Sequence, residues 1–381
     1  MNKFLLGTTA LISAAVFAAP AFAAEKIQLE LRGYHVGGVA YTDADLSAHH
    51  RDILNPLNNT TTDLTGDPNE INFGSDSEIH FRGSTTLDNG LKVSFRAELE
   101  LEDNSDVDGD ADQIDEVYIQ LDGGFGRIQF GQNDGAMYQQ HITAPNAFVG
   151  HGVNNPDMDL DPFVPVGGLD LISTYGQASG DDIKITYFTP NMNGFQVGAS
   201  YTPNPCKNDT GYASCVYDEF GRNYLEISGT FRSNLDNISF GISGGYGTGE
   251  SAAGDAEPTE WTIGGEIGFG GFTVGGSYRD GNLTGINGWE ESQWDAGASY
   301  ETGPWTLSLN YAQGRANSGP TFEIGGDGWT GGATYMYGPG MQIGFGVTTL
   351  DGGIDLRDPG LFHDSVEFDG MSFFVENVLS F

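Results

Sequence analysis

The chain has 381 residues, 58 of them glycine, and carries 53 acidic residues against 15 Lys and Arg, for a formal net charge of -38. Proteins that bind nucleic acid carry basic patches, so this charge argues against a nucleic-acid partner. The chain also has 24 Phe, 16 Tyr and 5 Trp, which sets it apart from acidic disordered proteins, since those are poor in aromatic residues.

The N-terminus predicts export. Lys3 is followed by the apolar run FLLGTTALISAAVFAAP and by Ala21-Phe22-Ala23, which has the form of an A-x-A cleavage site. We therefore expect residues 1–23 to be a cleaved signal peptide and the mature chain to begin at Ala24. A helical membrane anchor is the alternative, which the short run disfavours. No other segment approaches the length of a transmembrane helix, so a membrane location would require strands.

Alternation of apolar and polar residues predicts strands along the mature chain. In LKVSFRAELELE, residues 91–102, the odd-numbered residues are apolar and the even-numbered residues are polar. Side chains of a strand alternate between its faces, so this is a two-faced strand. A helical period of 3.6 is not apparent after the signal peptide. Sixteen strands are predicted, at residues 27–42, 78–87, 91–101, 115–121, 127–131, 182–190, 195–203, 222–232, 238–247, 259–269, 272–279, 292–300, 305–315, 329–337, 341–350 and 365–381.

The connections between these strands alternate strictly between short and long. The short ones are rich in turn residues and lie at 88–90, 122–126, 190–194, 233–237, 270–271, 301–304 and 338–340. The long ones lie at 43–77, 102–114, 132–181, 204–221, 248–258, 280–291, 316–328 and 351–364. This pattern predicts an all-β, 16-stranded antiparallel transmembrane β-barrel with short periplasmic turns and long outer loops. Aromatic residues near strand ends, such as Tyr187 and Trp294, suit the two membrane–water interfaces.

Four stretches resemble the general porins of Gram-negative outer membranes, particularly the alphaproteobacterial type. LDGGFGRIQFGQNDGAM (121–137) resembles the family's turn, short strand and entry into the third loop. SEIHFRGSTTLDNGLKVSFRAELE (77–100) and DIKITYFTPNMNGFQVGASYT (182–202) resemble two of its strand pairs. The final MSFFVENVLSF, ending at Phe381, resembles its assembly signal.

The resemblance spans the mature chain, 24–381, and implies a single barrel domain. It implies a water-filled outer-membrane channel for passive diffusion of small hydrophilic solutes and ions, assembled as a homotrimer. Barrel-assembly machinery, outer-membrane lipid and lipopolysaccharide would be its further partners. The third loop would fold into the lumen as a constriction, and residues 132–181 are independently too long for an ordinary connection. An exposed surface loop is the alternative for this segment.

In the resembling family, acidic residues of the third loop face basic residues of the barrel wall. The acidic candidates of the loop are Asp134, Asp157, Asp159, Asp161 and Asp170, with Asp181 and Asp182 at its end. The basic candidates of the wall are Arg32, His80, Arg82, Lys92, Arg96 and Arg127. Enteric relatives carry constriction arginines where this chain has Glu78 and acidic or neutral residues near Gln113. Together with the net charge, this predicts a preference for cations, although many acids could simply be solvated loop surface.

Two loop features suggest additional chemistry. DNSDVDGDADQIDE (103–116) offers calcium ligands at offsets similar to those of an EF-hand, although it connects strands and departs from the motif at both ends. The ligands would be Asn104, Asp106, Asp108, Asp110, Asp112 and Asp115. No cofactor is required, and an unliganded acidic loop is the alternative to structural Ca2+.

Cys206 and Cys215 are predicted to form a disulfide, because an exported chain meets oxidising conditions.

Three other functions compete with a general diffusion channel. A substrate-selective channel of the same architecture would show a ladder of aromatic or basic residues in its lumen. A barrel enzyme would need a nucleophile beside a base, but the seven His are scattered and no G-x-S-x-G motif appears with partners, so no catalytic residue is predicted. An exported adhesin would not need lipid.

Overall fold

The computed structural model describes residues 26–52, 59–63, 70–101, 114–154, 173–176, 179–204, 222–251, 257–282, 288–358 and 362–381. The predicted signal peptide, both cysteines and the calcium ligands from Asn104 to Asp112 lie outside these residues. The same is true of the loop residues Asp157, Asp159, Asp161 and Asp170. The structure therefore leaves these predictions untested.

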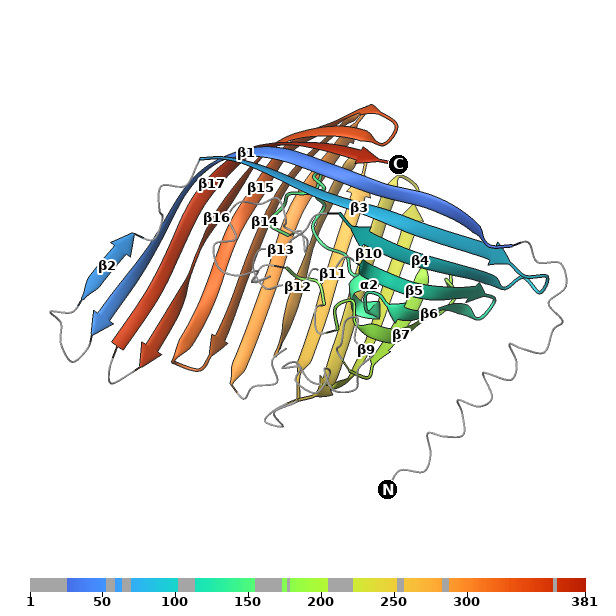
Figure 1. The fold of residues 1–381 in the computed structure, drawn as a ribbon, viewed down its shortest axis with the longest axis horizontal. Helices are drawn as coiled ribbons and strands as arrows, with labels where there is room; N and C mark the ends of the chain where they lie inside the picture. Colours follow the sequence, from blue (N-terminus) through green and yellow to red (C-terminus); the bar gives the residue numbers. More distant parts are fainter. Residues whose placement is uncertain are drawn as a thin grey trace, which may run out of the picture.

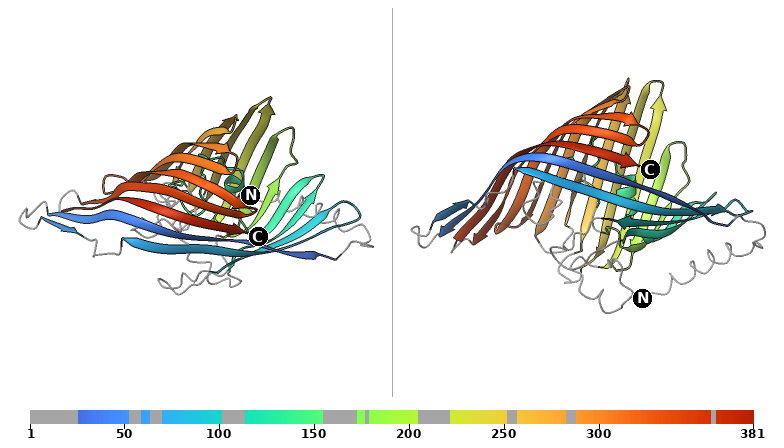
Figure 2. Two further views of the ribbon diagram at one scale, coloured as in Figure 1. Left: turned by 90° about the horizontal axis from the view of Figure 1, so that it is seen from above. Right: turned by 45° about the horizontal axis from the view of Figure 1, so that its top comes forward.

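Antiparallel strands form a closed ring (Figures 1 and 2). Each strand from β3 to β17 pairs with the next one, and β1 pairs with both β3 and β17. The strands are β1 (Gln28–Asp52), β2 (Thr60–Asp63), β3 (Ile71–Thr86), β4 (Lys92–Glu100), β5 (Ile114–Gly123), β6 (Gly126–Gln132), β7 (Ile183–Phe188), β8 (Phe195–Thr202), β9 (Arg222–Leu235), β10 (Ile238–Glu250), β11 (Thr259–Phe269), β12 (Phe272–Asn282), β13 (Trp289–Thr302), β14 (Trp305–Ser318), β15 (Phe322–Gly338), β16 (Met341–Asp358) and β17 (Phe362–Ser380). Because β2 pairs only with part of β1, the seventeen strands less β2 make a barrel of sixteen, which confirms the predicted fold.

The two faces of the barrel wall have opposite chemistry. In β4, Phe95 is 40% exposed, whereas Glu98 is 4% exposed. In β14, Leu309 is exposed and its neighbour Asn310 is buried. The apolar side chains therefore point outward, where hydrocarbon takes the place of a protein core, and the polar side chains point into the lumen. The tight turn at Gly270-Gly271 reverses the chain with positive φ at both residues, 58° and 87°, which is the handedness of a two-residue hairpin turn.

Several predicted loop boundaries are wrong. β1 runs to Asp52, ten residues past the predicted end at residue 42, and its added part pairs with β17. β3 begins at Ile71, and β15, β16 and β17 extend through most of the predicted loops 316–328 and 351–364. In the added part of β1 the alternation changes phase, because Asp43 and Asp45 take the odd positions that hold exposed apolar residues nearer the start of the strand, at Leu29 and Leu31. The main-chain hydrogen bonds continue regardless, because they do not depend on side-chain type.

A short helix lies in the segment that was expected to have no regular structure. α2 (Ala136–Gln140) follows Gly135 and contacts β7, β8, β9 and β10, inside the ring of strands (Figure 1). Five residues are too few to show a helical period, which is why the sequence pattern did not reveal it. No helix among the described residues is long and apolar enough to cross a membrane.

Candidate functional site

A cavity of about 680 Å³ lies between the inner wall at β1, β3, β4 and β5 and described parts of the segment 132–181. Its lining contains one arginine, Arg96, and one histidine, His80. Carboxylates outnumber these bases four to one: Asp76, Glu78, Glu98, Glu100, Asp115, Glu116, Asp134 and Asp181. Charge of one sign inside a low-dielectric wall concentrates counter-ions.

Strand register brings the wall residues of the cavity together. On β3 and β4, Glu78 lies opposite Glu100, and His80 lies opposite Glu98. Residues directly opposite on one face of an antiparallel pair have their Cβ atoms about 5 Å apart. The alternating pattern of the two strands therefore places both rows of polar side chains on the lumen face, within reach of each other.

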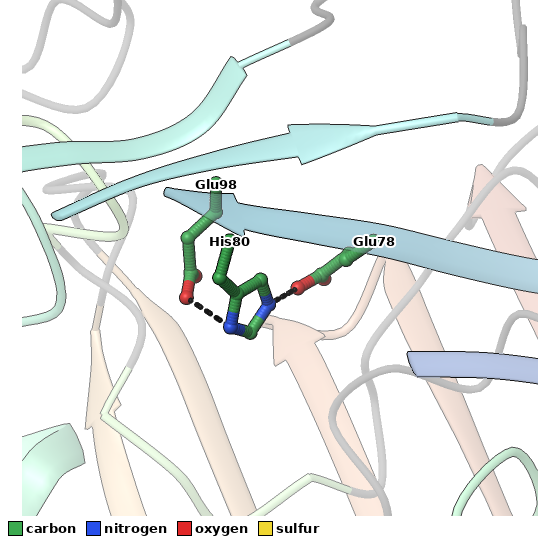
Figure 3. A group of neighbouring side chains, drawn as sticks. All are labelled: Glu78, His80 and Glu98. Carbon is green, nitrogen blue, oxygen red and sulfur yellow. Dashed lines mark hydrogen bonds and ion pairs between the residues drawn. The ribbon is translucent and has the colours of Figure 1, made fainter. Parts of the chain in front are cut away.

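His80 is held between two glutamates (Figure 3). Its Nε2 lies 2.6 Å from Oε2 of Glu78 and its Nδ1 lies 3.1 Å from Oε1 of Glu98. Glu98 is also in contact with Arg96, whose Nη1 lies 3.7 Å from Glu116. His80 and Arg96 thus contact carboxylates of the wall itself. The expected pairing of wall bases with loop acids stays a prediction, because Asp157, Asp159, Asp161 and Asp170 lie outside the described residues.

The predicted basic residues fall into two groups. His80, Arg82 and Arg96 lie side by side on β3 and β4, with Arg32 on the adjacent strand opposite His80. Arg32 forms an exposed ion pair with Glu30 at 2.7 Å. Lys92 and Arg127 lie instead near the tight turns, where both are register neighbours of Asp122, and Nε of Arg127 lies 2.9 Å from that carboxylate. The predicted set is therefore not one cluster.

Phe381, the last residue of the predicted assembly signal, pairs with Gly33 of β1 through two main-chain hydrogen bonds.

Asp134 is a predicted loop acid that lies among the described residues and lines the acidic cavity, as do Asp181 of the loop and the wall residue Glu116. The backbone N–H of Asp134 donates to Oε1 of Glu116 at 3.1 Å. Burial, together with the negative charges of Asp181 and Glu116, raises the pKa of Asp134 well above its usual range. This carboxyl therefore keeps its proton to a higher pH than an exposed aspartate does. In the same segment, burial lowers the pKa of His141 to about 4, so that ring is neutral at physiological pH.

Besides Glu116, three buried wall carboxylates accept main-chain N–H groups of the third-loop segment; we call these three, Glu226, Asp295 and Glu376, the anchor carboxylates. Glu226 accepts the N–H of Met137 at 3.1 Å and the hydroxyl of Ser179. Asp295 accepts the N–H of Ala144 at 2.9 Å.

Glu376 binds three consecutive residues of the loop segment. It is 0% exposed and accepts the N–H groups of Val149 and Gly150 at 3.1 and 3.2 Å. Nδ1 of His151 lies 2.9 Å from the same carboxylate, and the His151 ring stacks on Phe374 with centroids 3.8 Å apart. Residues 149–151 are therefore fixed to the last strand of the barrel.

Lys184 joins the two ends of the loop segment. It is 1% exposed, and its ammonium donates to the carbonyls of Asn133, Ser179, Gly180 and Asp182, the last three at 3.3, 2.6 and 2.8 Å. Sequence reasoning missed Lys184 and the anchor carboxylates. Their only signal is a charged residue at an inward strand position, and pore-lining residues share that signal.

Three groups of described residues bring possible metal ligands within 4.8 Å of one another: Glu78, His80 and Glu98; Glu78, Glu100 and Asp115; and Glu116, Asp134 and Asp181. The two all-carboxylate groups have the oxygen donors that Ca2+ prefers. In the first group both ring nitrogens of His80 already contact carboxylates, so a metal would have to displace one of those contacts.

The family model described as a Gram-negative porin matches residues 7–355. The chain belongs to this porin family. It is accordingly a channel of the outer membrane for passive diffusion of small hydrophilic solutes, as the sequence predicted. A search of curated proteins gives no match for this porin.

Solved structures support the fold of the porin. OmpT of Vibrio cholerae in its trimer form has a TM-score of 0.56 at 12% identity, covering 92% of this chain and 100% of that chain. An anion-selective porin from Comamonas acidovorans has a TM-score of 0.54 at 17% identity, covering 93% of this chain and 100% of that chain. OmpF of Salmonella typhi in complex with daunomycin has a TM-score of 0.56 at 15% identity, covering 91% of this chain and 98% of that chain.

Proposed function

We propose that this porin prefers cations to anions. The observation that carries the proposal is the cavity lining, where eight carboxylates surround Arg96 and His80. Both bases contact wall glutamates, so they leave little positive charge to attract anions. Carboxylates along a pore favour cations. The structural neighbour from Comamonas acidovorans is described as anion-selective, so the sign of selectivity must come from the lining side chains and not from the fold.

We further propose that residues 132–181 form the constriction that limits solute size. The described parts of this segment support the idea, because they border the acidic cavity and are bound to β9, β13 and β17 by the anchor carboxylates. A loop held at this many points can set a reproducible pore width. The acidic residues Asp157, Asp159, Asp161 and Asp170, which lie outside the described residues, would add to its negative charge.

The reversal potential of the channel in a planar bilayer tests the cation preference. With a KCl gradient across the bilayer, we expect the sign that corresponds to potassium permeating faster than chloride. A triple variant, Asp76→Asn, Glu98→Gln and Glu100→Gln, should move the potential toward zero. The matched control neutralises Asp88, Asp236 and Glu301 at the turns. A chloride preference of the wild-type channel would refute the proposal.

The remaining expectations concern assembly and ions. We propose a homotrimer, supported by the trimer form of Vibrio cholerae OmpT, in contact with lipopolysaccharide and inserted by barrel-assembly machinery. We propose no catalytic activity.

A structural Ca2+ at residues 104–115 remains a proposal, since only Asp115 of its ligands is described. If calcium binds there, adding a chelator should lower the temperature at which the trimer dissociates, and substituting Asp108 and Asp110 by Asn should remove that effect.

A further inference from the structure

The two faces of β14 to β17 and β1 exchange their chemistry on the side of Tyr311 and Trp329 that leads to the long outer loops. The ring centroids of these two residues are 4.6 Å apart, on the outward face of strands that run side by side (Figure 1). Such amphipathic rings mark a membrane–water interface. At their level the inner face is still polar, as in a water-filled channel, and its residues lie opposite one another in register: Asn310, Thr330, Thr348, Ser372 and Thr42.

Beyond this level, the inner face carries only apolar residues and glycine in three successive cross-strand rows. From β14 to β1 the rows are Ala312, Gly328, Leu350, Gly370 and Ala44; Gly314, Gly326, Gly352, Phe368 and Leu46; and Ala316, Ile324, Ile354, Val366 and Ala48. Residues directly opposite in register share a face of the sheet, and Ala312 and Ala316 are buried on the same side as Asn310. We call this surface the apolar vestibule wall.

The outer face changes in the opposite sense at the same height. Asp327, Asp351, Asp369 and Asp45 lie opposite one another in consecutive strands, at outward positions that hold apolar residues such as Phe373 lower in the wall. A sheet that is polar outside and apolar inside has the pattern of a soluble protein, whose apolar face packs on a core. Large apolar surfaces that face water mark sites of interaction. The apolar vestibule wall therefore requires a packing partner inside the barrel.

The third-loop segment already covers the lower edge of this wall. Val153 is 1% exposed and packs against Ala312, with Leu350 beside them. The side-chain amide of Asn310 donates to Oδ1 of Asn154 at 3.0 Å. The described stretch 114–154 therefore ends against β14, where the apolar vestibule wall begins, and the next residues of the chain start from that edge.

Residues 155–172 have the composition of a cover for this wall. These 18 residues include eight large apolar side chains: Met158, Leu160, Phe163, Val164, Val166, Leu169, Leu171 and Ile172. The described chain resumes at Ser173, whose carbonyl accepts a hydrogen bond from Arg279 of β12 at 3.4 Å. A chain of this length spans up to about 60 Å when extended, whereas the three rows rise by only about 14 Å. The segment is therefore long enough to cross the wall and return.

We propose that the apolar side chains of residues 155–172 pack on the apolar vestibule wall. In the run MDLD, residues 158–161, apolar and acidic residues alternate, and Asp170 lies between two leucines. With the apolar side chains on the wall, the acidic ones face the water of the outer entrance: Asp157, Asp159, Asp161 and Asp170. The inference rests on the proposed constriction, in which this segment lies inside the barrel, and it assigns these carboxylates to the path of entering cations.

Disulfide cross-linking tests the contact. In a protein with Cys206→Ser and Cys215→Ser, Phe163→Cys is combined with Ile354→Cys on the inner face of β16, or with Asp355→Cys on its outer face. We expect oxidation to link the inner pair roughly tenfold faster, because consecutive strand residues point to opposite faces. Leu160→Cys and Val166→Cys replace Phe163→Cys in parallel, so that the result does not depend on one register. Equal rates for inner and outer pairs at all three positions, or links between two copies of the chain, would overturn the proposal.

The accessibility of the wall gives a second measurement. Ile354→Cys alone should react with N-ethylmaleimide about tenfold more slowly than Asp355→Cys, because a covered side chain reacts only when the segment moves away. Adding Phe163→Ser, Val164→Ser and Val166→Ser together should abolish this protection and leave the reactivity of Asp355→Cys unchanged. The heat-dependent gel mobility of each variant reports whether its barrel is folded. Equal reactivity of the two cysteines in the unaltered segment would overturn the proposal.

Exclusion of polyethylene glycols of graded size from the channel, measured through their effect on conductance, separates this inference from the proposed constriction. A reactive wall in a pore that still excludes large polymers would overturn the packing on the wall and leave the constriction standing. A pore without a size limit would overturn the constriction and this inference with it.

Discussion

Two sides of the inner wall carry carboxylates that serve different purposes. On β9, β13 and β17 the anchor carboxylates face N–H and hydroxyl donors of the third-loop segment. On β3 and β4, Glu78, Glu98 and Glu100, here called the lining carboxylates, face the acidic cavity. All six occupy inward positions of strands. A carboxylate that contacts N–H or hydroxyl donors of the loop segment fixes structure, and one without such donors provides charge to the pore.

The largest effect should come from Lys184, which serves the structural purpose alone. In Lys184→Met, four backbone carbonyls lose their common donor, and each unsatisfied buried group costs about 1–3 kcal/mol. We expect the loop to open roughly 100-fold more often, the equivalent of about 3 kcal/mol. Thermolysin cleavage within residues 132–181 measures this, since the segment contains no Lys or Arg for trypsin. Lys92→Met is the control, and equal cleavage of the two variants would contradict the assigned role.

One substitution made on both sides of the wall tests the comparison directly. In Glu376→Gln, an amide nitrogen would face one of the donors Val149, Gly150 or His151, which should destabilise the loop by about 2 kcal/mol. Faster thermolysin cleavage, with larger fluctuations of single-channel current, should follow. Glu98→Gln should leave cleavage unchanged and lower the potassium-to-chloride permeability ratio. If the two variants behave alike in both assays, the distinction between anchor and lining carboxylates is wrong.

The sequence predicted the barrel better than it predicted the site. Strand number and closure follow from local patterns, namely period-two alternation and turn residues such as Gly270-Gly271, so they were predictable. The extension of β1 to Asp52 was not, because beyond residue 42 the alternation changes phase and acidic residues such as Asp43 and Asp45 take the outward positions. Glu376 and Glu98 have the same local signal, a charged residue on the inward face. Their separate roles depend on a loop more than 200 residues away from Glu376 in the chain, which a single sequence does not reveal.

Asp134 links the two sides, since it belongs to the loop but lies in the lining of the acidic cavity. Its raised pKa means that its negative charge is lost at a higher pH than that of exposed carboxylates. As the pH falls from neutral, cation preference should therefore begin to decline before the usual range of aspartate is reached. Asp134→Asn should remove this early decline and leave the later one. His141 does not contribute above a pH of about 4, because its pKa is lowered to that value.

The smallest effect is expected from the basic residues near the tight turns. Arg127 forms an ion pair with Asp122 and does not line the acidic cavity, and both partners are partly exposed to solvent. Such pairs contribute about 0–1 kcal/mol, and their charges largely cancel for an ion passing at a distance. Arg127→Gln should therefore change neither thermolysin cleavage nor reversal potential measurably, whereas Arg96→Gln, which frees Glu98 and Glu116, should increase the cation preference. A larger shift in reversal potential from Arg127→Gln than from Arg96→Gln would place the selective region at the turns and not between β3 and β5.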